Sequence, residues 1–149
     1  MMEKNKSGNN FFIDFEKIRT IDSVRIIYFI TFIILFILTK IGQTTYRSYI
    51  YENNIEDFGF ADSIGNSGGI LVQIFFGLAI LNPSRIKGLR LIVFFIMGYI
   101  LYEFAQKILP KGVFDWQDVY GTLIGGGVGI VVFLLTHGLV KRNRIIFKL

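Results

Sequence analysis

The sequence lacks cysteine altogether and contains only one histidine, one tryptophan and two prolines among its 149 residues. Without cysteine, the chain can form no disulfide, use no thiolate nucleophile and build no cysteine-ligated metal site. The single histidine, His137, lies at the end of an apolar run, where an imidazole is more often an interfacial side chain than a proton carrier or a metal ligand. The candidate chemistry is therefore sought among carboxylate and amide side chains.

Apolar residues, by contrast, are abundant. Hydrophobic residues make up 52% of the chain, 16 residues are phenylalanine, and the mean hydropathy is +0.54. A soluble fold of this size could not hide so much apolar surface, whereas a bilayer accepts it, so the composition predicts one integral membrane domain. The net charge of +5 does not indicate nucleic-acid binding, because the basic residues sit beside apolar segments instead of forming one patch.

Four apolar runs approach the length of a membrane-spanning helix, over residues 23–39, 65–81, 89–105 and 119–140. Pro83 and Pro110 fall just beyond the second and third runs, where a residue without an amide donor ends a helix. The predicted fold is an all-α membrane protein, a bundle of four transmembrane helices over residues 23–140. Residues 1–22 form an N-terminal segment, and residues 141–149 form a basic tail.

Lysine and arginine are distributed unevenly around these runs. All but four of the 16 basic residues fall before or at the start of the first run, between the second and third, or after the fourth. Because cytoplasmic segments carry an excess of basic residues, this bias predicts that both termini are cytoplasmic. The segment 40–63 becomes an outward loop whose aromatic residues lean on the headgroup region. Residues 11–18 fit either a helix on the inner membrane surface or a disordered tail.

Polar and small residues follow one helical face of the second run and one face at the end of the third. The first of these faces consists of Asp62, Asn66, Gly69, Gln73 and Gly77, and the second of Tyr99, Glu103 and Gln106. Such faces predict contact with protein instead of lipid. Gln73 lies deep enough in the membrane that its amide needs a partner or water. Glu103 interrupts an apolar run, which makes it a functional candidate by default.

The stretch FDWQDVYGTLIGGGVG opens the fourth run with Asp115 and Asp118. Asp118 shares a helical face with the hydroxyl group of Thr122. The same stretch carries a small-xxx-small pattern, which predicts close approach of a neighbouring helix. That pattern consists of Gly121, Gly125 and Gly129. Either aspartate alone also fits a simple role as a helix cap, because free amides at a helix N-terminus favour a carboxylate.

Four carboxylates from three helices are predicted to meet at the outer side of the bundle. They are Asp62, Glu103, Asp115 and Asp118. Like charges brought together repel one another or recruit a cation, a cost that a purely structural protein could avoid. We therefore favour a functional cluster in which these four acids are the candidates for catalysis and no metal site is established. The ligand-binding candidates are Asn66, Gln73, Tyr99, Gln106 and Thr122.

The order of these features resembles the VanZ-like family of small bacterial membrane proteins. The resemblance spans residues 62–129 and rests on the aspartate that opens the second run, on YEFAQ at the end of the third and on FDWQDVYGTLIGG at the start of the fourth. Many members have histidine where this chain has Asn66 and asparagine where it has Thr122, so a reaction that needs that imidazole would be closed to this chain. The resemblance implies a multi-pass protein of the bacterial cytoplasmic membrane and a link to glycopeptide antibiotic tolerance.

Three functions remain open. The first is a site that binds or processes a lipid-borne envelope component, in which an anionic headgroup would need a bridging divalent cation or the side chains of Arg47, Lys107 or Lys111. Processing would use one carboxylate as general acid and another as base, but no nucleophile motif or phosphate loop supports a reaction class. The second is a non-catalytic scaffold whose glycine faces pack against a membrane-protein partner or a second copy of the chain. The third, solute or proton transport, finds support in Gln73 and the polar face of its helix, but four short spans give a narrow path unless the protein oligomerises.

Overall fold

The computed structural model describes residues 22–146, with side chains through residue 139, and outside its turns this part of the chain is helical. Its elements are α2 (Ser23–Ile41), η1 (Gly42–Tyr46), α3 (Arg47–Glu52), α4 (Phe60–Leu81), α5 (Arg85–Gln106) and α6 (Trp116–Ile146). The element η1 is a π-helix that joins α2 to α3 without a break. The surface helix or tail expected over residues 11–18 lies outside the described residues, whereas the first part of the expected C-terminal tail continues α6 as a helix.

Within residues 22–146, four helical segments are long and apolar enough to cross a membrane, which agrees with the predicted number of spans and indicates a multi-pass membrane protein. The segments are Ser23–Glu52, Phe60–Leu81, Arg85–Gln106 and Trp116–Leu139. Three of them begin earlier than the apolar runs, and in two of these an aspartate caps the first turn. Asp57 accepts a hydrogen bond from the backbone N–H of Ala61 at 2.7 Å, and Asp115 accepts one from that of Gln117 at 2.9 Å.

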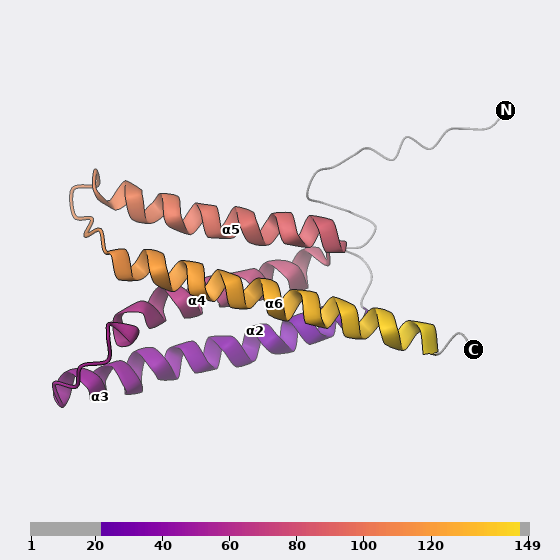
Figure 1. Cartoon of the computed structure of the whole chain (residues 1–149), viewed down its shortest axis with the longest axis horizontal. Helices are drawn as coiled ribbons and strands as arrows, with labels where there is room; N and C mark the ends of the chain where they lie inside the picture. Colours follow the sequence, from indigo (N-terminus) through magenta and orange to yellow (C-terminus); the bar gives the residue numbers. More distant parts are fainter. Residues whose placement is uncertain (1–21, 147–149) are drawn as a thin grey trace.

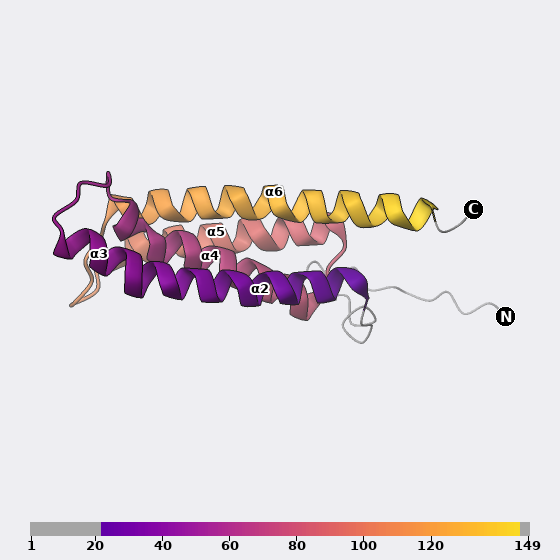
Figure 2. The ribbon, with the colours of Figure 1, turned by 90° about the horizontal axis from the view of Figure 1, so that it is seen from below.

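The helix α4 lies at the centre of the bundle and packs extensively against α2 and α6. The remaining long helix, α5, packs mainly against α6 and makes fewer contacts with α4 (Figure 1). The four long helices alternate in direction, so that α2 begins, α4 ends, α5 begins and α6 ends at one end of the bundle (Figures 1 and 2). The arrangement is the predicted four-helix bundle, with α2 and α5 at its two margins.

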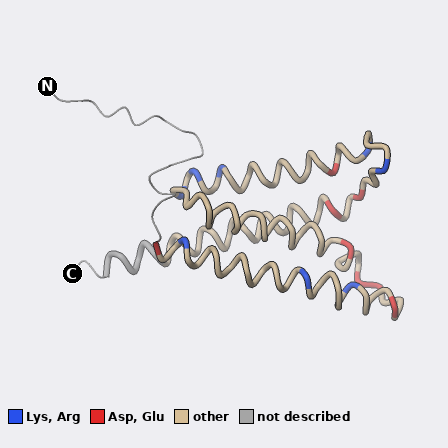
Figure 3. The backbone as a smooth tube through the Cα atoms, turned by 180° about the vertical axis from the view of Figure 1, so that it is seen from behind, with Lys and Arg blue, Asp and Glu red and all other residues tan. Residues whose placement is uncertain are grey.

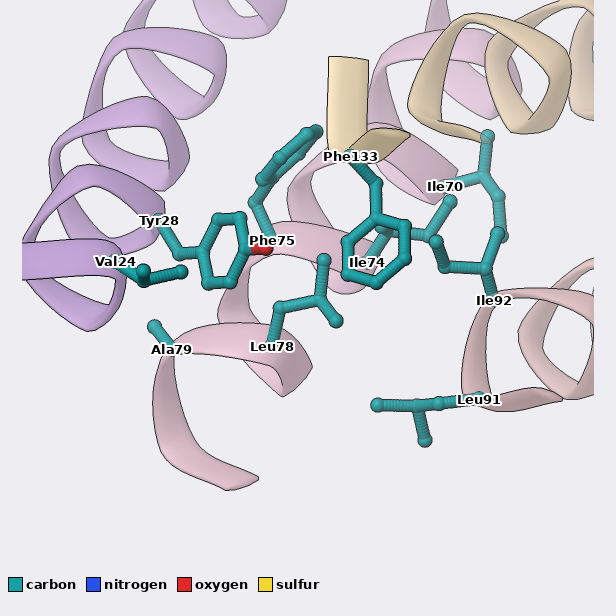
Figure 4. Close-up of a cluster of buried hydrophobic side chains, with 10 residues drawn as sticks. All are labelled: Val24, Tyr28, Ile70, Ile74, Phe75, Leu78, Ala79, Leu91, Ile92 and Phe133. Atoms are coloured by element: carbon teal, nitrogen blue, oxygen red, sulfur yellow. The ribbon is translucent and has the colours of Figure 1, made fainter. Parts of the chain in front are cut away.

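An aromatic cluster fills the core toward the end of the bundle where α2 begins. Tyr28, Phe75 and Phe133 come from α2, α4 and α6, and their rings point toward one another (Figure 4). The ring centroid of Tyr28 lies 6.0 Å from that of Phe75 and 6.1 Å from that of Phe133. The Tyr28 hydroxyl lies 2.7 Å from Nδ1 of His137, so the buried phenol has a hydrogen-bond partner and His137 belongs to this cluster.

The glycines of α6 that the sequence singled out lie against α4. A Cβ atom added at Gly121 would lie 2.8 Å from the carbonyl oxygen of Ser63, and one added at Gly125 would lie 2.9 Å from Cα of Ser67. At Gly129 the added atom would meet the side chain of an isoleucine of α4 at 2.9 Å. The two backbones therefore approach each other more closely than any larger residue would permit.

The expected outward loop over residues 40–63 is largely helical. The helix of α2 runs on through η1 and α3 to Glu52, and the non-helical connection covers only residues 53–59. The polar side chains of this segment are accommodated within the helix, since Thr44 donates to the carbonyl of Lys40 at 2.8 Å and Ser48 donates to that of Thr44 at 2.9 Å. The chain then turns back at Gly59, whose φ of 77° is a conformation that glycine adopts readily.

Charged residues are concentrated toward the two ends of the bundle, and few occur along its middle (Figure 3). We call the end where α4 and α6 begin the acidic end, since it holds Asp62, Glu103, Asp115 and Asp118. The opposite end, which holds Arg25 and the basic start of α5, is called the basic end. This separation of charged ends by an apolar middle suits a bundle that spans a bilayer.

Candidate functional site

Glu103 is the most buried charged residue in the described part of the chain. It is 2% exposed, although it lies only one turn from the end of α5. Two amides surround it: Nδ2 of Asn66 donates to Oε1 at 3.3 Å, and Nε2 of Gln106 donates to Oε2 at 2.7 Å. The amide of Gln106 is itself fixed, because its Oε1 accepts a hydrogen bond from the backbone N–H of Val113. Glu103 is therefore held by amides of two helices and has no ion-pair partner among the described residues.

The two aspartates of α6 have different surroundings. Asp115 is exposed and caps the first turn of α6, which is the structural role that its position also allowed. Asp118 is half-buried, and it lies near the side chain of Asn66 and near enough to Asp115 to interact electrostatically. Asn66 of α4 is thus bonded to the carboxylate of Glu103 from α5 and lies near that of Asp118 from α6.

Asp62 belongs to a separate group of side chains. Nη2 of Arg47 lies 3.3 Å from Oδ1 of Asp62, and the hydroxyl of Tyr51 donates to the same oxygen. The two charged side chains are 44% and 38% exposed, so their ion pair adds little stability. Asp62 and Tyr51 line an open hollow of about 470 Å³ beneath the connection from α3 to α4. Arg47, which was a candidate for neutralising an anionic headgroup, is therefore bonded to an acid of the protein itself.

The acids do not gather into a metal centre. Among the described residues, no three histidine, aspartate or glutamate side chains are placed so that they could hold one ion. The divalent cation suggested by the sequence thus has no ready-made site in this part of the chain. Lys107 is also engaged, because its Nζ lies 4.0 Å from the ring centroid of Phe114.

A cavity of about 460 Å³ lies between α4 and α5 at the side of the bundle. Its lining consists of Asn66, Gln73, Phe94, Phe95, Gly98, Tyr99 and Tyr102. Phe94 and Tyr102 are 61% and 60% exposed on the outer face of α5, so the cavity opens sideways, in the direction where lipid would lie. Asn66 lines the cavity and its amide also donates a hydrogen bond to Glu103, so one end of the cavity lies beside the buried carboxylate.

The polar face predicted for α4 contributes to this cavity in an unexpected way. Gln73 is exposed and lines the cavity, although the sequence placed it on a face covered by protein. The glycines of the same face approach α5, since a Cβ atom at Gly69 would lie 3.4 Å from the hydroxyl of Tyr99 and one at Gly77 would lie 2.8 Å from the ring of Phe95. The helices α4 and α5 therefore touch one turn before Gln73 and one turn after it along α4. The space between these two contacts is open.

Thr122 carries a polar atom without a partner. Its residue is fully buried, and its Oγ1 makes no hydrogen bond in the described part of the chain. The neighbouring residue Gly121 faces Ser63 and Ser67 of α4, so Thr122 lies at the level of Asn66. One turn further along α6, Gly126 faces Ile96 of α5. Since α5 and α6 run in opposite directions, the register places Thr122 near the level of Tyr99 and Glu103.

Sequence reasoning did not single out four residues that line the cavity, which are Phe94, Phe95, Gly98 and Tyr102. Gly98 borders it, and an added Cβ atom there would meet nothing within 4 Å. The rings of Phe95 and Tyr102 form much of its wall. A glycine in the middle of an apolar run is a signal that could have pointed here, because a membrane helix gains nothing from a glycine that packs against no neighbour.

Comparisons of the chain with protein-family models, with curated proteins and with solved structures find no match. The likeness to the VanZ-like family therefore stays a prediction from the sequence motifs. A function for the chain must be argued from the cavity and the side chains around it.

Proposed function

We propose that the chain is a VanZ-like integral membrane protein of the bacterial cell envelope that binds a lipid-borne envelope component between α4 and α5. The observation that carries the proposal is the lateral cavity of about 460 Å³, which joins an aromatic wall to polar groups at Asn66 and Gln73. An amphiphile could enter it sideways from the bilayer, place its chain along the aromatic wall and present its headgroup to the amides.

The proposal includes an orientation in which the acidic end faces outward and both termini are cytoplasmic. The excess of basic residues around the opposite end supports it, since cytoplasmic segments carry such an excess. Because the chain has no cysteine, single cysteines can report the orientation directly. We expect that Lys111→Cys reacts with a membrane-impermeant maleimide in intact cells, whereas Ser84→Cys reacts only after lysis. The reverse pattern would contradict the orientation.

Binding is supported better than catalysis by these side chains. Glu103 is enclosed by amides and does not line the cavity, so it cannot touch a bound molecule without moving. The alternative function, a scaffold that packs against a partner through its glycines, receives less support. Gly121, Gly125 and Gly129 are occupied by α4 of the same chain and are not free for another protein.

The test of lipid binding uses a matched pair of glycines. Gly98 borders the cavity and Gly127 does not, and an added Cβ atom would meet nothing within 4 Å at either position. Phenylalanine at position 98 should obstruct the cavity, whereas phenylalanine at position 127 should only add apolar surface to α6. Both variants are expected to fold.

Native mass spectrometry of the protein purified in mild detergent would measure bound lipid. We expect wild type and Gly127→Phe to retain a defined lipid, and Gly98→Phe to lose it. In a bacterial host that the protein protects from a glycopeptide, Gly98→Phe should also lose the protection. Equal retention of lipid by the two glycine variants would overturn the proposal.

A further inference from the structure

The orientation of the Asn66 amide is fixed by its neighbours. Nδ2 of Asn66 donates to Oε1 of Glu103 at 3.3 Å, as a carboxylate oxygen requires. Asn66 also lines the cavity, and its carbonyl oxygen is the acceptor that this side chain can offer to a molecule there. A molecule in the cavity therefore meets a hydrogen-bond acceptor at this point.

The charge behind this acceptor is negative. Among the described residues, no lysine or arginine forms an ion pair with Glu103 or Asp118. Two of the basic side chains at this end are engaged elsewhere, since Arg47 is bonded to Asp62 and Lys107 lies over the ring of Phe114, and no lysine or arginine of the described part of the chain lines the cavity. A cation near Asn66 would offset the cost of keeping the carboxylate of Glu103 buried.

Thr122 gives a second, independent indication of an unfilled polar position. Its hydroxyl is fully buried without a partner, and the register of α6 places it level with Asn66 and near Glu103. Buried polar groups in folded proteins almost always have a hydrogen-bond partner. A hydroxyl oxygen accepts hydrogen bonds, as do the neighbouring carboxylates and the free amide oxygen. Thr122, Glu103 and Asp118 do not line the cavity, so Asn66 presents the acceptor that a donor in the cavity would meet first.

The cavity wall suits a cation as well. The aromatic rings of Phe95, Tyr99 and Tyr102 line it. Aromatic faces attract ammonium groups, and more strongly where water is excluded. A phosphate or carboxylate would find neither a basic side chain nor a favourable potential in this cavity.

We infer that the cavity takes the ammonium group of a single-chain or lipid amine, which donates hydrogen bonds to the carbonyl oxygen of Asn66 in front of Glu103 and Asp118. This inference rests on the proposed function and names the class of headgroup that the site selects. Neutral hydroxyl headgroups donate hydrogen bonds too, but they would gain nothing from the negative charge. Preference for an amine over an alcohol is therefore the property to measure.

The experiment compares dodecylamine, dodecanol and dodecyl phosphate, which share one chain and differ in headgroup. The full-length protein is placed in nanodiscs of phosphatidylcholine, and each compound competes for the site in a native mass spectrometry titration. We expect dodecylamine to bind at least about tenfold more tightly than dodecanol, equivalent to about 1.4 kcal/mol, and dodecyl phosphate to bind more weakly than either. Glu103→Gln should abolish the preference for the amine without weakening the alcohol.

Controls separate this selection from general attraction of a cation to an acidic protein. Glu52→Gln removes an exposed carboxylate that lies outside the cavity, and it should leave the preference unchanged. If Glu103→Gln does not fold, Asn66→Leu removes the acceptor itself and should have the same effect on the amine. Equal affinity for amine and alcohol in the wild type, or a preference that persists in both variants, would overturn the inference.

The two proposals fail in different ways. If Gly98→Phe loses all three compounds while wild type binds them without preference, a lipid site exists but is not selective for amines. If Gly98→Phe binds all three as wild type does, the cavity is not the binding site, and both proposals fall.

Discussion

The close approach of α4 and α6 predicts that Gly125→Ala destabilises the protein. The added Cβ atom would lie 2.7 Å from Cγ2 of Ile70 and 2.9 Å from Cα of Ser67, and it would also meet the carbonyl oxygen of Ser67. Two of these three atoms belong to the backbone, so a rotamer change cannot relieve the overlap. The helices must move apart, which typically costs about 1–3 kcal/mol.

The matched control is Gly127→Ala, at a position where an added Cβ atom meets nothing within 4 Å. Alanine favours a helix over glycine by as much as about 1 kcal/mol, so this variant should be at least as stable as wild type. Gly129→Ala should fall between the two, because its Cβ atom meets the end of the Ile74 side chain at 2.9 Å, and that side chain can move.

Reversible unfolding of the purified protein by SDS in mixed micelles, followed by far-UV circular dichroism, would give the free energies of unfolding. We expect the order of stability to be Gly127→Ala, then Gly129→Ala, then Gly125→Ala, with a difference of about 2 kcal/mol or more between the extremes. A Gly125→Ala variant as stable as Gly127→Ala would refute the account of α4 and α6 as helices in backbone contact.

Three further substitutions test the basic half of the bundle by the same unfolding measurement. Arg25→Ala removes hydrogen bonds of 2.7 and 3.3 Å to the last carbonyls of α4 and should cost about 1.5–3 kcal/mol, with Arg25→Lys restoring only part of it. Tyr28→Phe keeps the stacked ring but loses the 2.7 Å hydrogen bond to His137, so we expect a loss of about 1 kcal/mol; no loss would mean that the bond is not formed. Gly88→Ala places a Cβ atom against the ring of Phe133 and should cost about 1–3 kcal/mol. In the double variant with Phe133→Leu the penalty of Gly88→Ala should shrink, whereas an additive result would show that the two residues do not interact.

The four spans could be predicted from sequence because a bilayer imposes a simple requirement. An apolar stretch of sufficient length must form a helix there, since its backbone groups have no other partners. The segment 40–52 escaped this reasoning because its glycine, threonine, tyrosine and serine residues read as a loop. The segment continues the helix of α2 through η1 without a break, and its threonine and serine hydroxyls donate to carbonyls one turn earlier.

The candidate site could be predicted only in part, for a related reason. Helical spacing placed Asn66 near one end of its helix and Glu103 near the matching end of another, and the structure has their polar atoms 3.3 Å apart. Spacing does not tell how far two helices stand from each other. Gln73 shares a face with Asn66 but is exposed in the cavity, because α4 and α5 touch on either side of it and separate between these contacts.

Two glycines of α5 show why the position of the cavity is a property of the fold and not of residue type. At Gly88 the ring of Phe133 from α6 fills the space that a side chain would need, so the absence of a Cβ atom lets the two helices pack closely. At Gly98, toward the acidic end of the same helix, nothing lies within 4 Å of that space. A glycine therefore allows close helix packing at one end of α5 and borders an open space toward the other end. A glycine that lets no neighbour approach widens the lateral opening, and this is the reason to expect that obstructing it affects a ligand and not the stability of the fold.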